Sequence, residues 1–170
     1  ADIEYLGQEG YPPLRIGPPA HLGAHSREVR IHGGTSSQFL SALLMIGPCL
    51  PHGLELVPEG DLVSRPYLEM TLQLMRYFGA QAEWQGDRIV VAPGVYTPKK
   101  FVVEADWSAA SYWYALAALA DAPDLRLNGL FADSWQGDAV LSDMMQSFGI
   151  QTDFDEKGIH LTSSGKAPKP

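Results

Sequence analysis

An internal repeat limits the possible folds of this 170-residue chain more than any other feature. The pattern M-x-x-F-G, which ends at Gly79, recurs 70 residues later and ends at Gly149. In each copy it closes a stretch with apolar residues at a period of 3.6, and its glycine stands where helices commonly end. Two copies of one supersecondary unit predict a fold that is built from repeats.

Each copy is predicted to be a βαβαββ unit, because strand-like and helix-like segments follow one another in the same order in both. The fold class is therefore predicted to be α/β (α+β), with tandem units preceded by a short strand pair at 2–6 and 13–16. The first unit is expected to have strands at 28–32, 54–58, 81–84 and 88–92 and helices at 37–50 and 65–79, and the second to have strands at 100–104, 125–128, 151–154 and 159–162 and helices at 108–120 and 136–149.

A pattern that suits phosphate binding lies at the start of the first predicted helix. Residues 33–38, G-G-T-S-S-Q, join a strand to an apolar run, and Thr35 and Gln38 have the spacing of a capping box. The first N–H groups of a helix have no partner within the helix, and the helix dipole makes that end partly positive. Glycines before it let a ligand approach, and hydroxyl groups add donors. The alternative is that Thr35, Ser36 and Ser37 only cap a buried helix.

The second predicted helix starts in a similar way. Ser64 stands in the capping position, and Pro66 is tolerated in the first turn. Two hydroxyl-bearing helix starts could converge on one anion, with Arg65 and Tyr67 nearby. The alternative makes Arg65 a solvated surface charge and Tyr67 a half-buried packing residue.

Three segments resemble the EPSP synthase (3-phosphoshikimate 1-carboxyvinyltransferase) family. Residues 35–45 are similar to its S-S-Q-F-L-x-A-L-L-M segment, residues 62–72 to its S-K/R-P-Y segment and the helix after it, and residues 103–112 to its E-G-D-x-S-S-A-S-Y segment. Fainter matches lie at 11–14 and 135–138. Because the five segments occur in order over almost the whole chain, the chain is identified as a member of this family.

The resemblance implies the larger architecture. It implies a protein of six such units, three in each of two domains. The units are arranged as an inside-out α/β barrel, with helices inside and sheets outside. Residues 1–98 are then expected to be the later part of one domain, and residues 99–170 the early part of the second. Pro93, Gly94 and Pro98 fit a linker between them.

The resemblance also implies an activity. The family transfers the enolpyruvyl group of phosphoenolpyruvate to the 5-hydroxyl of shikimate 3-phosphate and releases phosphate, on the way to chorismate and aromatic amino acids. Ser36, Ser37 and Ser64 match serines that hold the 3-phosphate of the substrate. These serines belong to the two helix starts at which the residues alone suggest an anion.

Three further substrate-binding residues follow from the resemblance. Gln38 matches a glutamine that reaches both substrate sites, Tyr67 matches a tyrosine beside the shikimate ring, and Arg65 replaces the commoner lysine. The acid–base groups of the family match nothing in this chain, so no catalytic residue is assigned. The chain is expected to be a fragment without turnover of its own.

The composition and charge of the chain argue against some classes of binding partner. A formal charge of −8 argues against nucleic acid and anionic membrane surfaces. No signal peptide or membrane-spanning run is visible, so a cytoplasmic enzyme is expected. No cofactor is expected, and no metal is assigned to His21 and His25, which lie in a segment rich in proline and glycine.

The oligomeric state and two other functions remain open. The full-length enzyme is expected to be a monomer, whereas a fragment with uncovered unit faces is expected to expose apolar surface and could self-associate. A relative of UDP-N-acetylglucosamine enolpyruvyl transferase shares the fold and reaction type, but the signature of its nucleophilic loop is absent. A non-catalytic anion-binding module is the alternative from another class.

Overall fold

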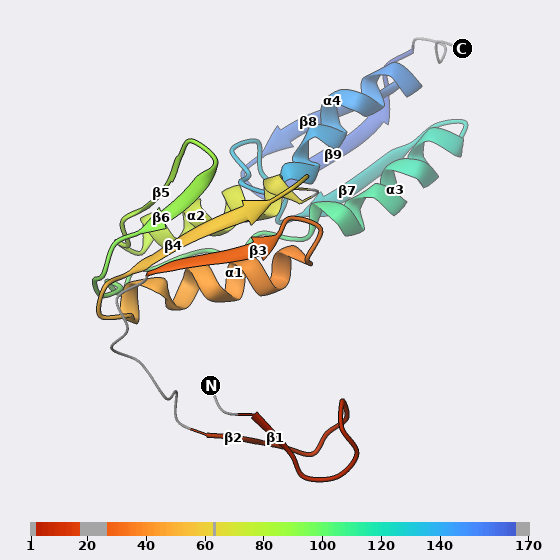
Figure 1. The fold of residues 1–170 in the computed structure, drawn as a ribbon. Helices are drawn as coiled ribbons and strands as arrows, with labels where there is room; N and C mark the ends of the chain where they lie inside the picture. The colour runs from red at the N-terminus through yellow and green to blue at the C-terminus, as the bar shows by residue number, and fades with distance from the viewer. Residues whose placement is uncertain (1–2, 18–26, 63, 166–170) are drawn as a thin grey trace.

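The computed structural model describes residues 3–17, 27–62 and 64–165, so His21 and His25 lie outside the described residues. The described chain is a mixed α/β structure in which a hairpin precedes two successive α/β halves (Figure 1). The hairpin pairs β1 (Ile3–Tyr5) with β2 (Leu14–Ile16) in antiparallel orientation and stands apart from the rest of the described chain. No helix among these residues is long and apolar enough to cross a membrane.

The first half has the predicted order of strands and helices. Its sheet has the order β3-β4-β6-β5, with β3 parallel to β4 and the other pairs antiparallel. Helices α1 and α2 cover one face of this sheet (Figure 1). The elements are β3 (Glu28–His32), α1 (Ser37–Ile46), β4 (Leu54–Glu59), α2 (Arg65–Tyr77), β5 (Ala82–Gln85) and β6 (Arg88–Val91), with a short 3₁₀ turn at Gly47–Cys49 after α1.

Helix α2 forms because its apolar residues share one face. Leu68, Leu72 and Met75 recur at helical spacing and are fully or almost fully buried against the sheet. Gly79 follows the helix at a φ of 91°, a left-handed conformation that glycine adopts without strain. These residues belong to one hydrophobic core, formed by Leu40, Leu44, Leu54, Leu56, Leu68, Leu72, Met75, Ala80, Ala82, Ile89 and Val91.

The second half has a separate core beneath a three-stranded sheet of order β7-β9-β8. Trp107 and Tyr114 are its largest buried side chains, and Ile150, Ile159 and Leu161 contribute from the strands. The elements are α3 (Trp107–Leu119), β7 (Asp124–Asn128), a 3₁₀ turn at Gly137–Val140, α4 (Leu141–Met144), a 3₁₀ turn at Met145–Phe148, β8 (Ile150–Asp155) and β9 (Gly158–Ser163).

The strand predicted at 100–104 is wrong, because aromatic contacts hold this segment elsewhere. Phe101 stacks on Trp135 with ring centroids 5.9 Å apart, and its ring lies 5.4 Å from that of Tyr77 and 6.1 Å from that of Phe78. The Tyr77 hydroxyl also donates a hydrogen bond to the Lys100 carbonyl. We call Tyr77, Phe78, Phe101 and Trp135 the junction cluster, because these rings join the two halves.

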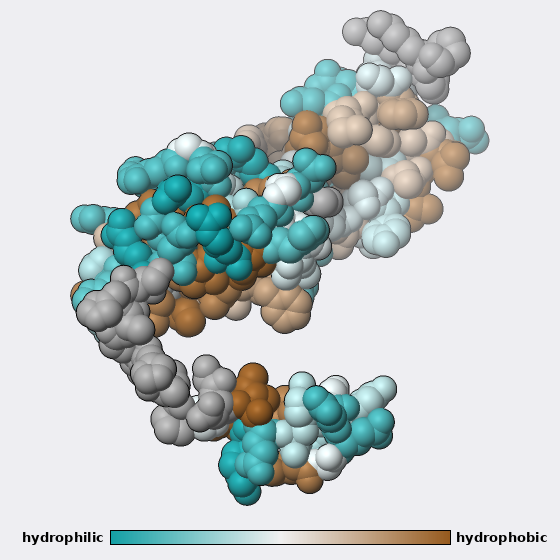
Figure 2. Space-filling model, in the orientation of Figure 1, coloured by the Kyte–Doolittle hydropathy of each residue, from teal (hydrophilic) through white to brown (hydrophobic). Residues whose placement is uncertain are grey.

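The continuous helix predicted at 136–149 is also wrong. Only four residues, Leu141–Met144, are α-helical, and a 3₁₀ turn lies on each side. The apolar stripe is present, but Val140, Met144 and Phe148 are each more than half exposed. Helices in proteins derive most of their stability from packing of such a stripe, and here only part of it, including Leu141 and Met145, packs against the second core. The expected apolar exposure is found here, on α3 and along α1 (Figure 2).

Burial predicts very different costs for two leucine truncations. Leu72→Ala, in the first core, is expected to lower the free energy of unfolding by about 2–5 kcal/mol, because it leaves a cavity. Leu119→Ala removes the same atoms from a side chain that is 85% exposed and should cost less than about 0.5 kcal/mol. Urea denaturation followed by circular dichroism measures both values, and equal costs would contradict the described core.

An ion-pair cluster on the outer face of the first sheet centres on Glu55. Arg88 Nη1 lies 2.7 Å from its Oε1, and Arg27 Nε lies 3.2 Å from its Oε2. The hydrogen bond from Arg88 is the largest cause that lowers the pKa of Glu55 from its usual value near 4.5; partial burial opposes it, and Arg27 adds to the lowering. The ionised form of Glu55 is therefore favoured more strongly in the folded state than in the unfolded chain.

This lowered pKa predicts the acid response of the fold. A carboxyl group with a depressed folded-state pKa stabilises the protein above its ordinary pKa, and that contribution is lost as the pH falls through the folded-state value. Glu55→Gln is expected to be less stable than the parent at pH 7 and to approach it below about pH 4. Urea denaturation at a series of pH values measures the difference; Glu156→Gln, at an exposed turn, is the control that should show none.

Candidate functional site

The two helix starts singled out by the sequence lie side by side. Because β3 and β4 run parallel, α1 and α2 begin at the same end of the sheet (Figure 1). The loops before them touch: a Cβ atom on Gly33 would lie 2.7 Å from the Asp61 carbonyl oxygen. Further along the helices, the hydroxyl oxygens of Ser41 and Thr71 are 2.9 Å apart and hydrogen-bonded. The structure thus brings the two hydroxyl-bearing segments together.

At the first start, Ser36 rather than Thr35 caps α1. The Ser36 hydroxyl accepts a hydrogen bond from the Gln38 N–H at 3.4 Å. The Thr35 N–H instead donates to the His32 carbonyl at 2.9 Å within the preceding turn, so the predicted capping box is wrong. Within the described chain, the side chains of Ser37 and Gln38 have no hydrogen-bond partner and remain available to a ligand.

At the second start, Ser64 occupies the predicted capping position of α2 but does not cap it. Its hydroxyl makes no cap hydrogen bond, although the residue is half-buried. The Tyr67 side chain, one turn into the helix, is about half exposed. Neither hydroxyl bonds to another residue in the part of the chain that the structure describes, so both can donate to a bound molecule.

Arg65 points away from its neighbours at this site. Its Nε lies 3.4 Å from Glu69 Oε1, and its guanidinium carbon lies 4.6 Å from the ring centroid of Trp84. The side chain is 60% exposed, so the ion pair with Glu69 is weak and the guanidinium can turn without a large cost.

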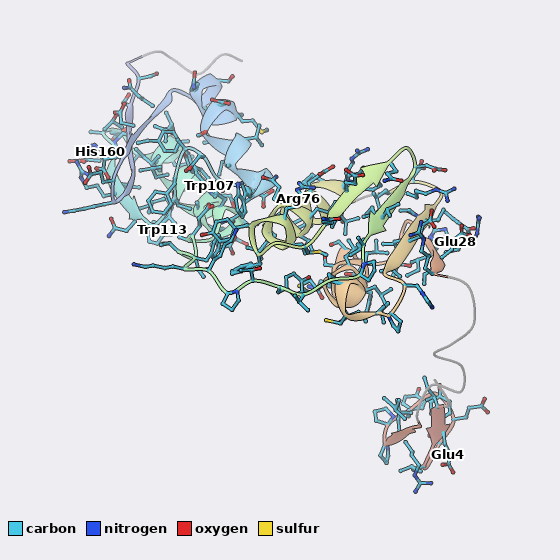
Figure 3. All side chains as sticks on the ribbon, turned by 90° about the vertical axis from the view of Figure 1, so that its left-hand side faces the viewer. Glu4, Glu28, Arg76, Trp107, Trp113 and His160 are labelled. Atoms are coloured by element: carbon cyan, nitrogen blue, oxygen red, sulfur yellow. The ribbon has the colours of Figure 1, made fainter. Side chains whose placement is uncertain are left out.

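A cleft of about 660 Å³ separates α2 from the second half. Ser64, Tyr67 and Thr71 line it on the α2 side, whereas Ser36, Ser37, Gln38 and Arg65 are outside its wall. Figure 3 shows the second half, with Trp107 labelled, set against the α2 side of the first half. The rest of the wall is largely apolar and includes Met45, Met70, Leu74, Phe101, Val103, Trp135 and Val140.

Gln136 organises the opposite wall of this cleft. Its Nε2 donates to the Ala105 carbonyl at 2.7 Å and to Glu104 Oε2 at 3.3 Å, and its Oε1 accepts from the Trp107 N–H at 2.9 Å. One side chain therefore fixes the three residues that lead into α3. In the sequence, residues 135–138 are only a faint match to the family, and this match predicts no role for Gln136.

The charge of the cleft is negative on its second-half side. Glu104, Asp106 and Asp138 all line it. Asp106 caps α3 by accepting a hydrogen bond from the Ser108 N–H at 2.8 Å, and the Ser108 hydroxyl donates a hydrogen bond to Asp138. Its wall contains no lysine or arginine among the described residues. Within the cleft wall, an anion would therefore meet only neutral donors, such as the hydroxyl groups of Ser64 and Tyr67 on the first-half side.

No metal centre is found in the part of the chain that the structure describes. Within 3–17, 27–62 and 64–165, no three His, Cys, Asp or Glu side chains come together in a way that could hold an ion. The carboxylates of the cleft are instead engaged with Gln136, Ser108 and the first turn of α3.

Comparison with known proteins decides the family. The sequence pattern of EPSP synthase (3-phosphoshikimate 1-carboxyvinyltransferase) matches residues 1–170. The chain belongs to this family. It is similar to a 3-phosphoshikimate 1-carboxyvinyltransferase of Bacteroides fragilis, with 49% identity over 166 residues, which are 97% of this chain and 40% of that protein.

More distant relatives carry the same name. The enzyme of Cellvibrio japonicus is 42% identical over 153 residues (88% of this chain, 35% of the relative), and that of Neisseria gonorrhoeae is 38% identical over 165 residues (95% and 37%). The chain thus spans about 40% of the length of the curated relatives that it matches.

The hydrogen bonds of Gln136 predict that truncating it destabilises the second half. Gln136→Ala leaves the Trp107 N–H and the Ala105 carbonyl without their partner, and should cost about 1–3 kcal/mol in the free energy of unfolding. Gln151→Ala is the matched control, because Gln151 is exposed and its side chain bonds only to Asp153 among the described residues. Chemical denaturation measures both, and a cost for Gln136→Ala no larger than that of the control would contradict the role described for Gln136.

Proposed function

We propose that this chain forms the shikimate 3-phosphate-binding part of a 3-phosphoshikimate 1-carboxyvinyltransferase. The observation that carries the proposal is the meeting of two hydroxyl-bearing helix starts at one end of a sheet, in a chain of this family. Ser37 and Ser64 offer hydroxyl donors without partners among the described residues, and the N–H groups of two helix starts add partial positive charge. These donors and this partial charge support the binding of a phosphate dianion.

Each predicted site residue then has a role in binding. Ser36, Ser37 and Ser64 hold the 3-phosphate. Gln38 lies at the exposed start of α1, from which its amide reaches between the two substrates, and Tyr67 packs beside the shikimate ring from the wall of the cleft.

Arg65 requires a movement before it can take part. In the described structure it is paired with Glu69 and lies over Trp84. We assign it to the edge of the site, where it adds positive charge when its guanidinium turns toward the phosphate. The exposed, weak ion pair permits this turn.

The proposed reaction is transfer of the enolpyruvyl group of phosphoenolpyruvate to the 5-hydroxyl of shikimate 3-phosphate. Proton transfer at the reacting carbon needs positioned acid and base groups. The cleft carboxylates Glu104 and Asp138 already bond to Gln136 and Ser108, so they are poor candidates. The chain alone is therefore proposed to bind without turnover, and the acid–base groups to belong to the longer protein.

The proposed architecture follows the same reasoning. We propose that the first half is a βαβαββ unit and the second half the αβαββ part of another, that both belong to an inside-out α/β barrel, and that they lie in two domains with the boundary near Pro98. Support comes from the two separate cores, which lie on either side of that boundary. The exposed apolar residues of α3, among them Trp113, Leu116 and Leu119, are then surfaces that further units or a second copy would cover.

Titration calorimetry with shikimate 3-phosphate tests the proposed binding site. The purified chain is expected to bind it, and Ser37→Ala/Ser64→Ala should weaken binding at least about 10-fold, since a hydrogen bond to a charged group contributes roughly 1.5–3 kcal/mol. Ser147→Ala, an exposed serine in the second half, is the matched control and should bind like the parent.

Two further titrations separate the alternatives. Shikimate without the phosphate should bind far more weakly, and UDP-N-acetylglucosamine should not bind. Absence of shikimate 3-phosphate binding by the folded parent chain, or equal binding by the double variant, would overturn the proposed anchor. Stronger binding of the nucleotide sugar would favour the other enolpyruvyl transferase.

A further inference from the structure

A pair of hydroxyl groups links the two helices whose starts form the proposed phosphate site. The Thr71 hydroxyl of α2 donates a hydrogen bond to the Tyr67 carbonyl at 2.9 Å. Because a hydroxyl group has one hydrogen, the 2.9 Å bond between the hydroxyl oxygens of Ser41 and Thr71 is donated by Ser41 of α1. Hydrogen bonds therefore run from α1 through Thr71 to the first turn of α2. Within the described residues, no other side-chain hydrogen bond joins these two helices.

The Thr71 hydroxyl lies where an apolar side chain would be easier to bury. Thr71 is the only polar or charged residue that is buried in the part of the chain that the structure describes, with 9% of its surface exposed. The leucines that α1 and α2 bury in the first core gain stability from contacts that have no preferred direction. A hydrogen bond of 2.9 Å, in contrast, is lost when its two atoms move apart by about 1 Å. The hydroxyl pair thus limits how far one helix can slide along the other.

The hydroxyl pair lies close to both helix starts. Ser41 is four residues after Ser37, and Thr71 is four residues after Tyr67, so the bond lies about 6 Å along each helix from these residues. Ser64 directly precedes α2. Groups that bind one ligand together must be held within about 0.5 Å of their productive positions. A slide of one helix along the other would exceed this limit by moving the Ser37 hydroxyl relative to that of Ser64.

We infer that Ser41 and Thr71 are positioning residues, which fix α1 against α2 and thereby the spacing of the donors that bind the phosphate. Ser41 is outside the wall of the cleft, so it acts through Thr71 rather than on a ligand. Thr71 lines the cleft, but its hydroxyl hydrogen is already donated to the Tyr67 carbonyl. This inference rests on the proposed function, because it concerns the same shikimate 3-phosphate site.

Titration calorimetry of Thr71 variants separates positioning from stability. Thr71→Val keeps the shape of the side chain without the hydroxyl, and should weaken shikimate 3-phosphate binding at least about 5-fold, since hydrogen bonds to a charged group depend on geometry. Thr71→Ser keeps the hydroxyl and should bind like the parent, although urea denaturation should show a loss of stability from the missing buried methyl group. Weak binding by both variants would overturn the inference, because packing rather than the hydroxyl would then set the affinity.

Variants of the partner residue test whether the two hydroxyl groups act together. Ser41→Ala should weaken binding about as much as Thr71→Val, and the double variant Ser41→Ala/Thr71→Val should bind no more weakly than Thr71→Val, because both changes remove one interaction. Ser142→Ala is the matched control, since the half-buried Ser142 hydroxyl donates only within its own turn, to the Ala139 carbonyl at 3.0 Å. It should bind like the parent.

NMR spectra without ligand separate this inference from the proposed function. Thr71→Val should shift the backbone amide signals of Ser37 and Gln38 on α1, and Ser41→Ala should shift that of Arg65 on α2, whereas Ser142→Ala should shift none of them. Unmoved amide signals in both variants, or parent-like binding by Thr71→Val, would overturn the inference and leave the proposed function standing. Shifted signals in a parent chain that does not bind shikimate 3-phosphate would overturn the proposed function and support the fixed arrangement of the helices.

Discussion

The parallel pairing of β3 with β4 is the interaction on which the rest of the site depends. Parallel neighbours must be joined by a crossover, and here the crossover is helix α1. Both strands therefore end at the same edge of the sheet, and the two helices that follow start at that edge. Neither helix start alone would hold a phosphate firmly, since one set of N–H groups and one hydroxyl offers few donors. The pairing of the strands is what brings the two helix starts, one with Ser36 and Ser37 and the other with Ser64, to the same end of the sheet.

The two halves meet through a small number of contacts of different kinds. Gly137 lies so close to Pro66, at the start of α2, that a Cβ atom there would be 2.7 Å from the proline ring. On the other side of the cleft, the junction cluster packs aromatic rings from both halves. Gln136 ties the connecting segment to α3. Contacts of this size leave each half dependent on its own core, so the geometry of the cleft can change while both cores remain intact.

The sequence predicted most where local pattern and packing agree. Helix α2 follows its apolar period because Leu68, Leu72 and Met75 are buried in a core, whereas the same period at 137–148 gives mostly 3₁₀ turns because more than half of its stripe is exposed. The strand predicted at 100–104 is absent because the conformation of this segment depends on contacts with the rings of Tyr77 and Trp135. These residues are distant in sequence, so a local pattern could not predict the contacts. Within the site, the neighbouring hydroxyls of Thr35 and Ser36 both suit a cap, and only the backbone turn selects Ser36. The role of Gln136 arises from bonds that span 29 to 32 residues.

The three carboxylates on the second-half side of the cleft expose the proposed anion to a negative electrostatic potential. A phosphate held by the first half would face Glu104, Asp106 and Asp138 across a gap that contains no positive side chain of the described chain. Like charges across a largely apolar space repel more strongly than they would in open water. A bound phosphate would therefore push the halves apart, unless a cation entered the space between them. The width of the cleft and the binding of an anion beside it would therefore be coupled through this repulsion.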